Sequence, residues 1–587
     1  MEPEKKKRWH RLSRIDLKKV DKQSKKVEVA TARHARKFLL GRLENLQHIR
    51  RHLFGWLLLL LVLISLNVAQ VMFDQNYVQV DQPMQNSAYG EGVLGPLNNL
   101  NPLFASSDAE ISASKLMFSG LLSYDKVGRL QGDVAQNYQI SPNGKTYTVN
   151  LKPNVKWHDG KPLTAQDVVY TVRTMQDPKT GSRHYSSWQN IEVAATTPQQ
   201  VVFTLPTSYA PFASAMTFPI LPEHILGKVP PEQLQENEFN GNPVGSGPFS
   251  YVDLQTIDAS KDKKALQLDR YEEYWDGPSK LSRFSLYVYG NREDLVKGVQ
   301  QREVNAASGV KVNTTRLQST DVALNNGVFA LFKTDNIILK DKNVRKALVQ
   351  GLDREKLRSE LGGKKVLEGP IINDQTPIAN QVIQPGYDVT AASQLLDAAG
   401  WVKGSDGIRY KAGQPLKLRI VSVDTSSYRK LVGLLSRHWK QLGIKAETQL
   451  IDPQQIQQII LRPRAYDILV YELSMGGDPD GYAFWHSSQA SNTGLNFSNY
   501  VSPSADDALV TARGRSNTAQ RDAKYANFAK KWVDDAPAVA LYRSSLSYTT
   551  TGGTQSITKT DALVSSTDRY FNVTNWSSET EKVYNTP

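Results

Sequence analysis

The fold of this chain is indicated first by residues 157–170, which read WHDGKPLTAQDVVY. The Gly160-Lys161-Pro162 segment interrupts regular structure and predicts a surface turn that includes His158. Thr164 can accept a hydrogen bond from the first amides of a helix, and the apolar residues that follow continue that helix. The stretch therefore predicts a turn followed by a helix capped at Thr164.

Short strands and helices alternate around this stretch. Residues 147–151 are rich in strand-forming side chains and lie between the turn signals Asn143-Gly144 and Pro153-Asn154. Later segments follow the same pattern, with strands expected at 416–421, 467–471 and 538–542 and helices at 428–442 and 522–533. Elements alternating at these lengths indicate α/β lobes.

Length and composition narrow the class of protein. A chain of 587 residues predicts several domains, because single cores stop growing at roughly 250–300 residues. Hydrophobic residues make up 40% and charged residues 22%, which is ordinary for a globular protein. The absence of cysteine excludes disulfides, thiolate metal sites, a cysteine nucleophile and a lipid anchor on cysteine.

Most of the formal net charge of +13 lies in an N-terminal tail. Residues 1–52 contain 17 basic and 6 acidic side chains, which leaves 54 basic and 52 acidic side chains for the other 535 residues. A nucleic-acid-binding domain carries a basic excess of its own. We therefore expect no nucleic-acid partner for the part of the chain that follows the tail.

Residues 53–73 form an uncharged stretch of 21 residues, and about 20 helical residues cross a bilayer. Arg50 and Arg51 precede it, so the positive-inside rule places residues 1–52 in the cytoplasm and the remainder outside, as a single-pass protein of the cell membrane. A cleaved signal is the alternative, but the leader is long and a small-x-small site is missing. A buried core helix would need a second apolar run of similar length to pack against.

Residues 74–98, which follow the apolar stretch, are polar and are expected to form a linker.

The basic tail has three interpretations, of which contact with nucleic acid is the least favoured. It can adhere to anionic lipid headgroups, with each basic residue near the surface contributing about 1 kcal/mol. It can equally serve only as the topology signal.

Six motifs in order resemble the family 5 extracellular solute-binding proteins, the oligopeptide-, dipeptide- and nickel-binding subunits of ATP-binding-cassette (ABC) importers. The quoted stretch matches the family pattern W-x-D-G-x-P-x-T-A-x-D-V almost without departure. The other five motifs are NPVGSGPF at 242–249, NVRKAL with LDR at 343–354, DAAGW at 397–401, GDPD at 477–480 and DAP at 535–537.

The resemblance implies an α/β fold, a two-lobed periplasmic-binding-protein-like ectodomain of the three-part type II form, preceded by one transmembrane helix. Two chain crossings, near residues 325 and 535, would act as the hinge for lobe closure. The implied parts are a lobe 1 core at 99–125, 240–325 and 535–587, a lobe 1 accessory part at 126–239, and lobe 2 at 326–534.

The resemblance implies a binding protein, not an enzyme, that captures oligopeptides in the cleft between the lobes and delivers them to an ABC permease without a cofactor. A membrane-bound sensor or adhesion subunit is the alternative, because a simple anchor does not need a tail of 52 residues. A hydrolase is disfavoured, because no catalytic Ser-His-Asp order, paired carboxylates or metal-ligand spacing stands out. Asp478 does not open a calcium loop, because the twelfth position is Gln489.

A peptide in a closed cleft must pair its backbone groups, and an added strand does so with little sequence preference. The residues implied by resemblance fall in two short segments, which are Ser106, Ser107 and Asp108 in lobe 1 and Leu473, Ser474, Met475 and Gly476 in lobe 2. Tyr185 and Trp188 match aromatic positions near the cleft, or they pack within the accessory part.

One position departs from the family pattern. Peptide binders of this family place an aspartate three residues before the position of Asp478, where it pairs with the ligand's free amine, but this chain has Met475 there. Methionine cannot neutralise a buried ammonium group. Either Asp108, Glu472 or Asp478 supplies the charge, or the ligand has no free amine at this point. We prefer Asp108, because Glu472 is three positions from Met475 and faces the other way in a regular strand.

Overall fold

The computed structural model describes residues 33, 46–76, 79–83, 86–372 and 382–584 and divides into two compact units. The first unit, residues 1–82 and 582–587, contains helix α2 (Leu46–Asn76) and strand β1 (Gln79–Pro83). β1 pairs with β22 (Thr580–Tyr584). The apolar span Leu53–Met72 of α2 is long enough to cross a membrane and has no buried residue. The tail expected at 1–52 lies largely outside the described residues.

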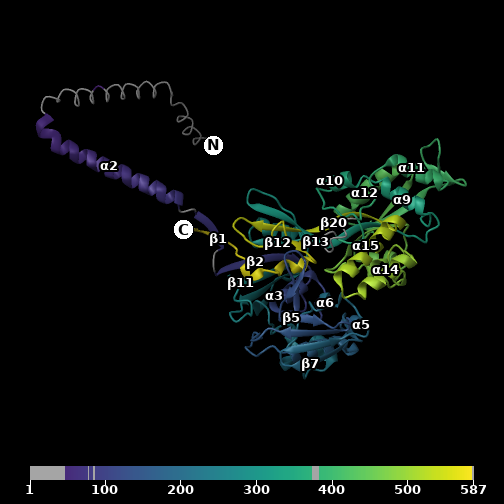
Figure 1. Cartoon of the computed structure of the whole chain (residues 1–587), viewed down its shortest axis with the longest axis horizontal. Coiled ribbons are helices and arrows are strands. Elements are labelled where there is room, and N and C mark those ends of the chain that lie inside the picture. The colour runs from purple at the N-terminus through teal and green to yellow at the C-terminus, as the bar shows by residue number, and fades with distance from the viewer. Residues whose placement is uncertain (1–32, 34–45, 77–78, 84–85, 373–381, 585–587) are drawn as a thin grey trace, which may run out of the picture. The chain divides into compact units, whose positions relative to one another are not determined.

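The second unit, residues 83–581, is built on one 11-stranded mixed sheet (Figure 1). Its strand order is β18-β17-β19-β13-β20-β12-β2-β11-β10-β9, and β21 pairs separately with β13. The strands are β2 (Ser87–Leu94), β9 (Phe249–Asp258), β10 (Lys263–Arg270), β11 (Leu281–Tyr289), β12 (Ala306–Ser308), β13 (Leu317–Phe332), β17 (Lys417–Val423), β18 (Lys445–Ile451), β19 (Ile468–Ser474), β20 (Ala538–Thr551) and β21 (Ala562–Leu563).

β13 and β20 are long enough to belong to two lobes at once. In lobe 2, successive side chains of β13 point to opposite faces of the sheet, so Val328 and Ala330 enter one core and Phe329 and Leu331 enter another. In lobe 1, Val322 belongs to a third core. Helices cover the lobe 2 sheet, and they are α9 (Lys342–Gln350), α10 (Arg354–Glu360), α11 (Val389–Ala398), α12 (Ser426–Gln441), α14 (Pro503–Arg513) and α15 (Thr518–Asp535).

The accessory part of lobe 1 has a separate antiparallel sheet in the order β5-β6-β8-β7, packed against helix α4 (Ala165–Gln176). Thr164 caps α4, and the Asp167 carboxylate accepts a hydrogen bond from the Thr164 amide at 2.8 Å. The predicted turn and capped helix are confirmed. The strands are β5 (Ala135–Ile140), β6 (Thr146–Leu151), β7 (Glu192–Thr197) and β8 (Gln200–Thr204).

His158 does more than occupy the predicted turn. Its Nδ1 accepts the Gly245 amide at 3.1 Å and its Nε2 lies 3.0 Å from the Gly247 carbonyl. A Cβ at Gly245 would lie 1.9 Å from the Met117 carbonyl oxygen. Two of the six sequence motifs therefore contact each other and join the accessory part to the lobe 1 core.

The expected linker at 74–98 is wrong in its second half. Residues 87–94 form β2, an interior strand of the main sheet, with Tyr89 and Val93 buried. The glycines that looked like linker residues are needed there for close packing, since a Cβ at Gly92 would lie 2.5 Å from Leu295 Cδ1.

The second crossing between lobes also differs from the expectation near residue 535. Val539 and Leu541 of β20 lie in a lobe 2 core, and the first residue of this strand in the lobe 1 core is Leu546. The crossing therefore falls close to Arg543–Ser545. The 538–542 run was correctly predicted as a strand, but its side chains are buried by lobe 2. The strands and helices expected at 416–421, 467–471, 428–442 and 522–533 are confirmed as β17, β19, α12 and α15.

Candidate ligand-binding site

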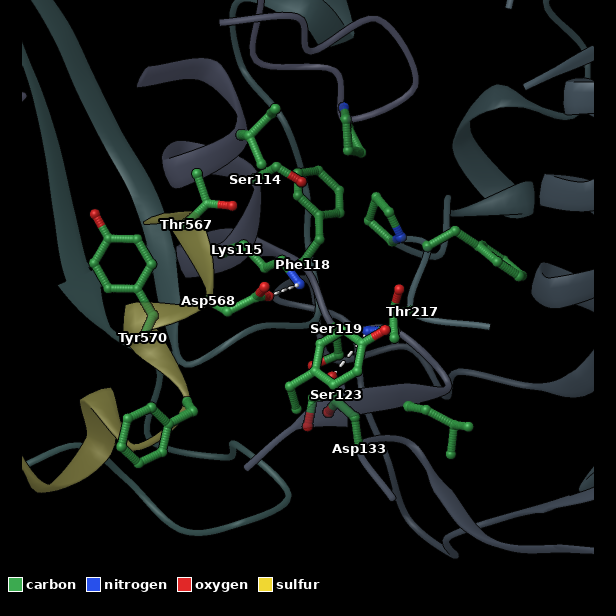
Figure 2. Close-up of a pocket in the computed structure, with 18 of the residues that line it drawn as sticks. Ser114, Lys115, Phe118, Ser119, Ser123, Asp133, Thr217, Thr567, Asp568 and Tyr570 are labelled. Carbon is green, nitrogen blue, oxygen red and sulfur yellow. Dashed lines mark hydrogen bonds and ion pairs between the residues drawn. The ribbon is translucent and has the colours of Figure 1, made fainter. Parts of the chain in front are cut away.

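A cavity of about 530 Å³, which we call the lobe 1 cavity, lies in lobe 1 (Figure 2). Its lining comes from residues 102–133, 183–188, 214–219, 248–276 and 564–574, all in lobe 1. Its walls contain both aromatic rings and side-chain hydroxyl groups. The rings belong to Phe118, Tyr124, Trp188, Phe218, Tyr274, Trp275, Tyr570 and Phe571.

Helix α3 (Asp108–Met117) forms one wall of the cavity. Ser107 caps it, and the carboxylate of the buried Glu110 accepts hydrogen bonds from the Ser106 and Ser107 amides at 2.8 and 3.2 Å. These bonds lower the pKa of Glu110, although its burial opposes them. Lys115 lies in the last turn, where a cation interacts favourably with the helix dipole.

Lys115 meets Asp568 across the cavity wall (Figure 2). Lys115 Nζ lies 3.1 Å from Asp568 Oδ1, and the Asp568 side chain is 9% exposed. The second carboxylate oxygen accepts the Ser565 amide at 3.0 Å and its hydroxyl at 2.7 Å. The cavity thus presents a fixed pair of opposite charges.

A buried network supports this wall. Arg569 donates to both carboxylate oxygens of Glu91 at 2.8 and 3.0 Å and to Ser112 of α3 at 3.0 Å. Burial disfavours the charged guanidinium, but the Glu91 charge outweighs it and raises the pKa of Arg569. The network fixes the short helix η9 (Ser566–Tyr570) against β2 and α3, which places Asp568 and Tyr570 on the cavity wall.

Asp133 lies on another wall of the cavity. Its carboxylate accepts the Gly120 amide at 2.9 Å and Trp275 Nε1 at 3.1 Å. Lys152 Nζ lies 3.2 Å from the centre of the Trp275 ring. Burial raises the pKa of Asp133 to about 6, although the Gly120 amide and Lys152 oppose the shift.

Lobe 2 reaches the rim of this cavity with residues 474–478, which we call the rim segment. Gly477 lies against the cavity residue Tyr124, since a Cβ built on it would be 2.4 Å from Tyr124 Cε1. Gly476 has a φ of +70°, a left-handed conformation that favours glycine. Ser474 is exposed, whereas Leu473 and Met475 are buried.

The edge of β19 that leads into the rim segment is only partly covered. β13 pairs with β19 through Ser474, but β17 pairs with it only from Ile468 to Val470. Across the described strands, residues 471–474 therefore have a ladder partner on one side only. The parallel strands β17, β18 and β19 have their carboxyl ends next to these residues. In α/β sheets, ligands bind outside the carboxyl ends of the strands.

The three acidic residues that could pair with a ligand amine already have different partners within the protein. Asp478 forms an ion pair with Arg521, and Glu472 accepts a hydrogen bond from Asn326 at 2.7 Å. Asp108 is exposed at the start of α3 and accepts the Ser566 hydroxyl at 3.1 Å.

The two predicted aromatic residues have different positions. The buried Trp188 packs its ring 5.5 Å from Phe212 and 5.1 Å from Phe218, and it also lines the cavity. Tyr185 begins the short helix α5 (Tyr185–Trp188) and is half-buried outside the lining. Trp188 therefore packs within the accessory part and also lines the lobe 1 cavity, and its role near the ligand cleft stays a prediction.

A second contact joins the lobes away from the cavity. The Ala210 amide donates to the Arg513 carbonyl at 2.8 Å, and the Ser208 hydroxyl donates to the Gly514 carbonyl at 2.9 Å. The Arg513 guanidinium lies 4.8 Å from the Tyr209 ring and 4.0 Å from the Tyr482 ring. We call this the α14 contact.

Sequence reasoning missed Lys115, Asp133 and Asp568. Asp568 follows Ser565 at the spacing of a capping box, a signal that was present but points only to a helix start. Lys115 and Asp133 carry no local signal. Within the described part of the chain, no three His, Asp or Glu side chains are grouped so that they could hold a metal ion.

Two lobes joined by long strands, with a cavity in lobe 1 whose lining residue Tyr124 contacts lobe 2, are typical of ligand-binding proteins of the periplasmic-binding-protein class. The family of bacterial extracellular solute-binding proteins, family 5, matches residues 129–495, and this chain belongs to that family. The expected family and the expected two-lobed α/β fold are confirmed. The family consists of binding proteins that serve ABC importers, so the chain is not an enzyme.

Relatives with different ligands share this architecture. The oligopeptide-binding protein AppA of Bacillus subtilis is 28% identical over 481 residues, covering 78% of this chain and 87% of its own. Its structure with a nonapeptide has a TM-score of 0.66 at 26% identity, covering 84% of this chain and 99% of the other. NikZ of Campylobacter jejuni, in complex with Ni(L-His), has a TM-score of 0.68 at 25% identity with the same coverage.

Proposed function

We propose that this protein is a membrane-anchored extracellular solute-binding protein that captures oligopeptides and delivers them to an ABC permease. The uncovered edge of β19 at residues 471–474 carries the proposal. A peptide laid along this edge would pair its backbone as an added strand, and each buried backbone group left unpaired costs about 1–3 kcal/mol. The lobe 1 cavity adjoins the rim segment and offers space for a side chain.

The relatives support a peptide as the ligand. The Bacillus subtilis protein is described as oligopeptide-binding and its structure contains a nonapeptide. A nickel complex is the competing ligand class, because the Campylobacter jejuni protein binds Ni(L-His). The mixture of rings and hydroxyl groups in the cavity suits varied peptide side chains.

Asp108 is our candidate for the group that pairs with a free peptide amine. Asp478 is held by Arg521 and Glu472 is held by Asn326, whereas Asp108 is exposed and accepts a hydrogen bond from the Ser566 hydroxyl. We expect Asp108→Asn to weaken binding of peptides with a free amine about tenfold. Binding of the same peptides after N-acetylation should not change, which is the internal control.

The anchor is assigned to α2. Its span Leu53–Met72 is apolar and unburied, and the chain has no cysteine for a lipid. Sequencing the N-terminus of protein recovered from washed membranes tests this directly. A mature protein that begins at residue 1 supports the anchor. A mature protein that begins just after the apolar span means that the span is a cleaved signal.

Binding itself is tested with a pool of unblocked peptides of varied length. We expect saturable heat release, a smaller radius of gyration by X-ray scattering and recovery of every peptide intact. A parallel titration uses nickel with histidine. Compaction with nickel and histidine but not with peptides would contradict the peptide assignment. Capture of a signalling protein by residues 1–52, with no permease, would favour the sensor alternative.

A further inference from the structure

Strand β13 contains an irregularity where it passes between the lobes. Ala323 pairs with Ser545 and Gly327 pairs with Arg543, so three residues of β13 face the single residue Ser544 of β20. Such bulges bend a strand and interrupt its regular pairing. We call residues 324–326 the hinge bulge. It lies where the strand leaves the lobe 1 core and enters the lobe 2 cores.

Asn325 is the central residue of the hinge bulge and is 4% exposed. Its side-chain amide donates to the Gly476 carbonyl at 3.1 Å, and its main-chain carbonyl accepts the Met475 amide at 2.8 Å. Its Oδ1 accepts Arg543 Nη2 at 2.6 Å. One residue thus contacts the rim segment twice and the second crossing strand once.

Lobe 1 meets the hinge bulge from the other side. β21 pairs with β13 at Ala323 and Leu324, and residues 564–574 that follow β21 line the lobe 1 cavity. A Cβ at Gly128 of lobe 1 would lie 3.6 Å from Asn325 Nδ2. Asn325 is therefore placed between the wall of the cavity and the rim segment.

We infer that Asn325 is a positioning residue that holds the rim segment in its ligand-binding conformation and links its displacement to the angle between the lobes. The inference rests on the proposed function, because the rim segment is the part of lobe 2 proposed to contact the peptide. Asn325 acts through Met475 and Gly476 and does not itself touch the ligand. Arg543, which also donates to the Leu324 carbonyl at 2.7 Å, fixes the amide in this orientation.

The chemistry of the site requires an amide at this position. The Gly476 carbonyl accepts a hydrogen bond from this side chain and Arg543 donates one to it, and the amide of asparagine supplies both the donor and the acceptor. An aspartate would keep and strengthen the bond to Arg543. It would also place a carboxylate oxygen opposite the Gly476 carbonyl, which removes the bond and repels the rim segment.

Asn325→Asp is the test, because it removes one bond without leaving a cavity. Three quantities are measured on the full chain in detergent: amide hydrogen exchange at residues 473–478, affinity for the unblocked peptide pool, and the decrease in radius of gyration at saturation. Asn496→Asp is the matched control. Asn496 is also buried in lobe 2 and donates to the His486 and Tyr500 carbonyls at 3.1 and 2.9 Å.

We expect Asn325→Asp to accelerate exchange in the rim segment at least tenfold, weaken peptide binding at least tenfold and reduce compaction at saturation. Asn496→Asp should lower the melting temperature and leave all three readouts unchanged. Unchanged rim-segment exchange in Asn325→Asp overturns the inference, as does loss of affinity with full compaction. If the wild-type protein binds no peptide, the proposed function fails, while the exchange comparison still decides the role of Asn325.

Discussion

The two lobes hold their sides of the site by different interactions. Lobe 1 uses buried charges, because Arg569 and Glu91 fix the cavity wall that carries Asp568. In lobe 2, Asn325 holds Met475 and Gly476 of the rim segment through hydrogen bonds to their main-chain groups, and an ion pair with Arg521 holds Asp478 at the end of the segment. We expect the buried charges to keep the lobe 1 wall rigid, whereas the bonds to main-chain groups leave the rim segment able to adjust to the proposed peptide ligands. The comparison predicts stability effects in lobe 1 and affinity effects in lobe 2.

The largest effect is expected for Arg569→Ala. It leaves Glu91 buried without its cation, and breaking such a pair costs about 3–5 kcal/mol. The loss of unfolding free energy is measured by denaturant unfolding followed by tryptophan fluorescence. Arg283→Ala removes an exposed pair with Asp269 at 2.8 Å and should cost less than about 1 kcal/mol. Equal losses in both variants would contradict a special role for the buried pair.

A smaller effect, on affinity, is expected for Gly477→Ala. The added Cβ meets the Tyr124 ring at 2.4 Å and pushes the rim segment from the cavity. Peptide affinity measured by calorimetry should fall about tenfold with little change in unfolding free energy. Gly552→Ala is the control, because a Cβ there meets no atom within 4 Å. A rim segment that is not part of the site would tolerate both substitutions equally.

The α14 contact tests whether lobe 2 is held only through the crossing strands. Arg513→Ala removes two ring contacts and the ion pair with Asp480 at 3.0 Å. Each ring contact contributes about 0.5–1 kcal/mol. Scattering should show a larger radius of gyration without ligand and a near-normal value with peptide. An unchanged unliganded radius would mean that the main-chain bonds at Ala210 and Arg513 suffice.

The smallest effect is expected from the pH dependence of lobe 1. Because the folded pKa of Asp133 is about 6 and its ordinary value is 3.8, the folded state binds this proton more tightly than the unfolded chain. The stabilisation is present below pH 4 and is lost as the pH rises to 6. Asp133→Asn removes the titrating group, so the melting temperature of the variant minus that of wild type should become more positive as the pH rises from 4 to 6. If the difference in melting temperature between the variant and wild type does not change with pH, the pKa of Asp133 is not raised.

Much of the fold could be predicted from local patterns. The capped helix after Thr164, the strands at 416–421 and 467–471 and the apolar span at 53–73 follow from spacing within a few residues. The prediction failed at residues 87–94, because glycines that permit close packing in β2 look the same in sequence as those of a linker.

The site was less accessible to prediction. Leu473 to Gly476 could be proposed because they follow a recognisable strand. Their role as ligand contacts stays a prediction, as do those of Ser106, Ser107, Tyr185 and Trp188. The ion pair between Lys115 and Asp568 could not be predicted, because the two residues are far apart in the sequence and no local pattern indicates that they meet.

The sequence by itself determined the α/β lobes, the apolar span and the family, because caps, periodicities and motifs act between neighbouring residues. Only the tertiary structure decided which side chains face the cavity, that Arg521 holds Asp478, and that Asn325 joins the rim segment to both crossing strands. These contacts depend on how distant segments pack against each other, and packing is a property of the whole chain.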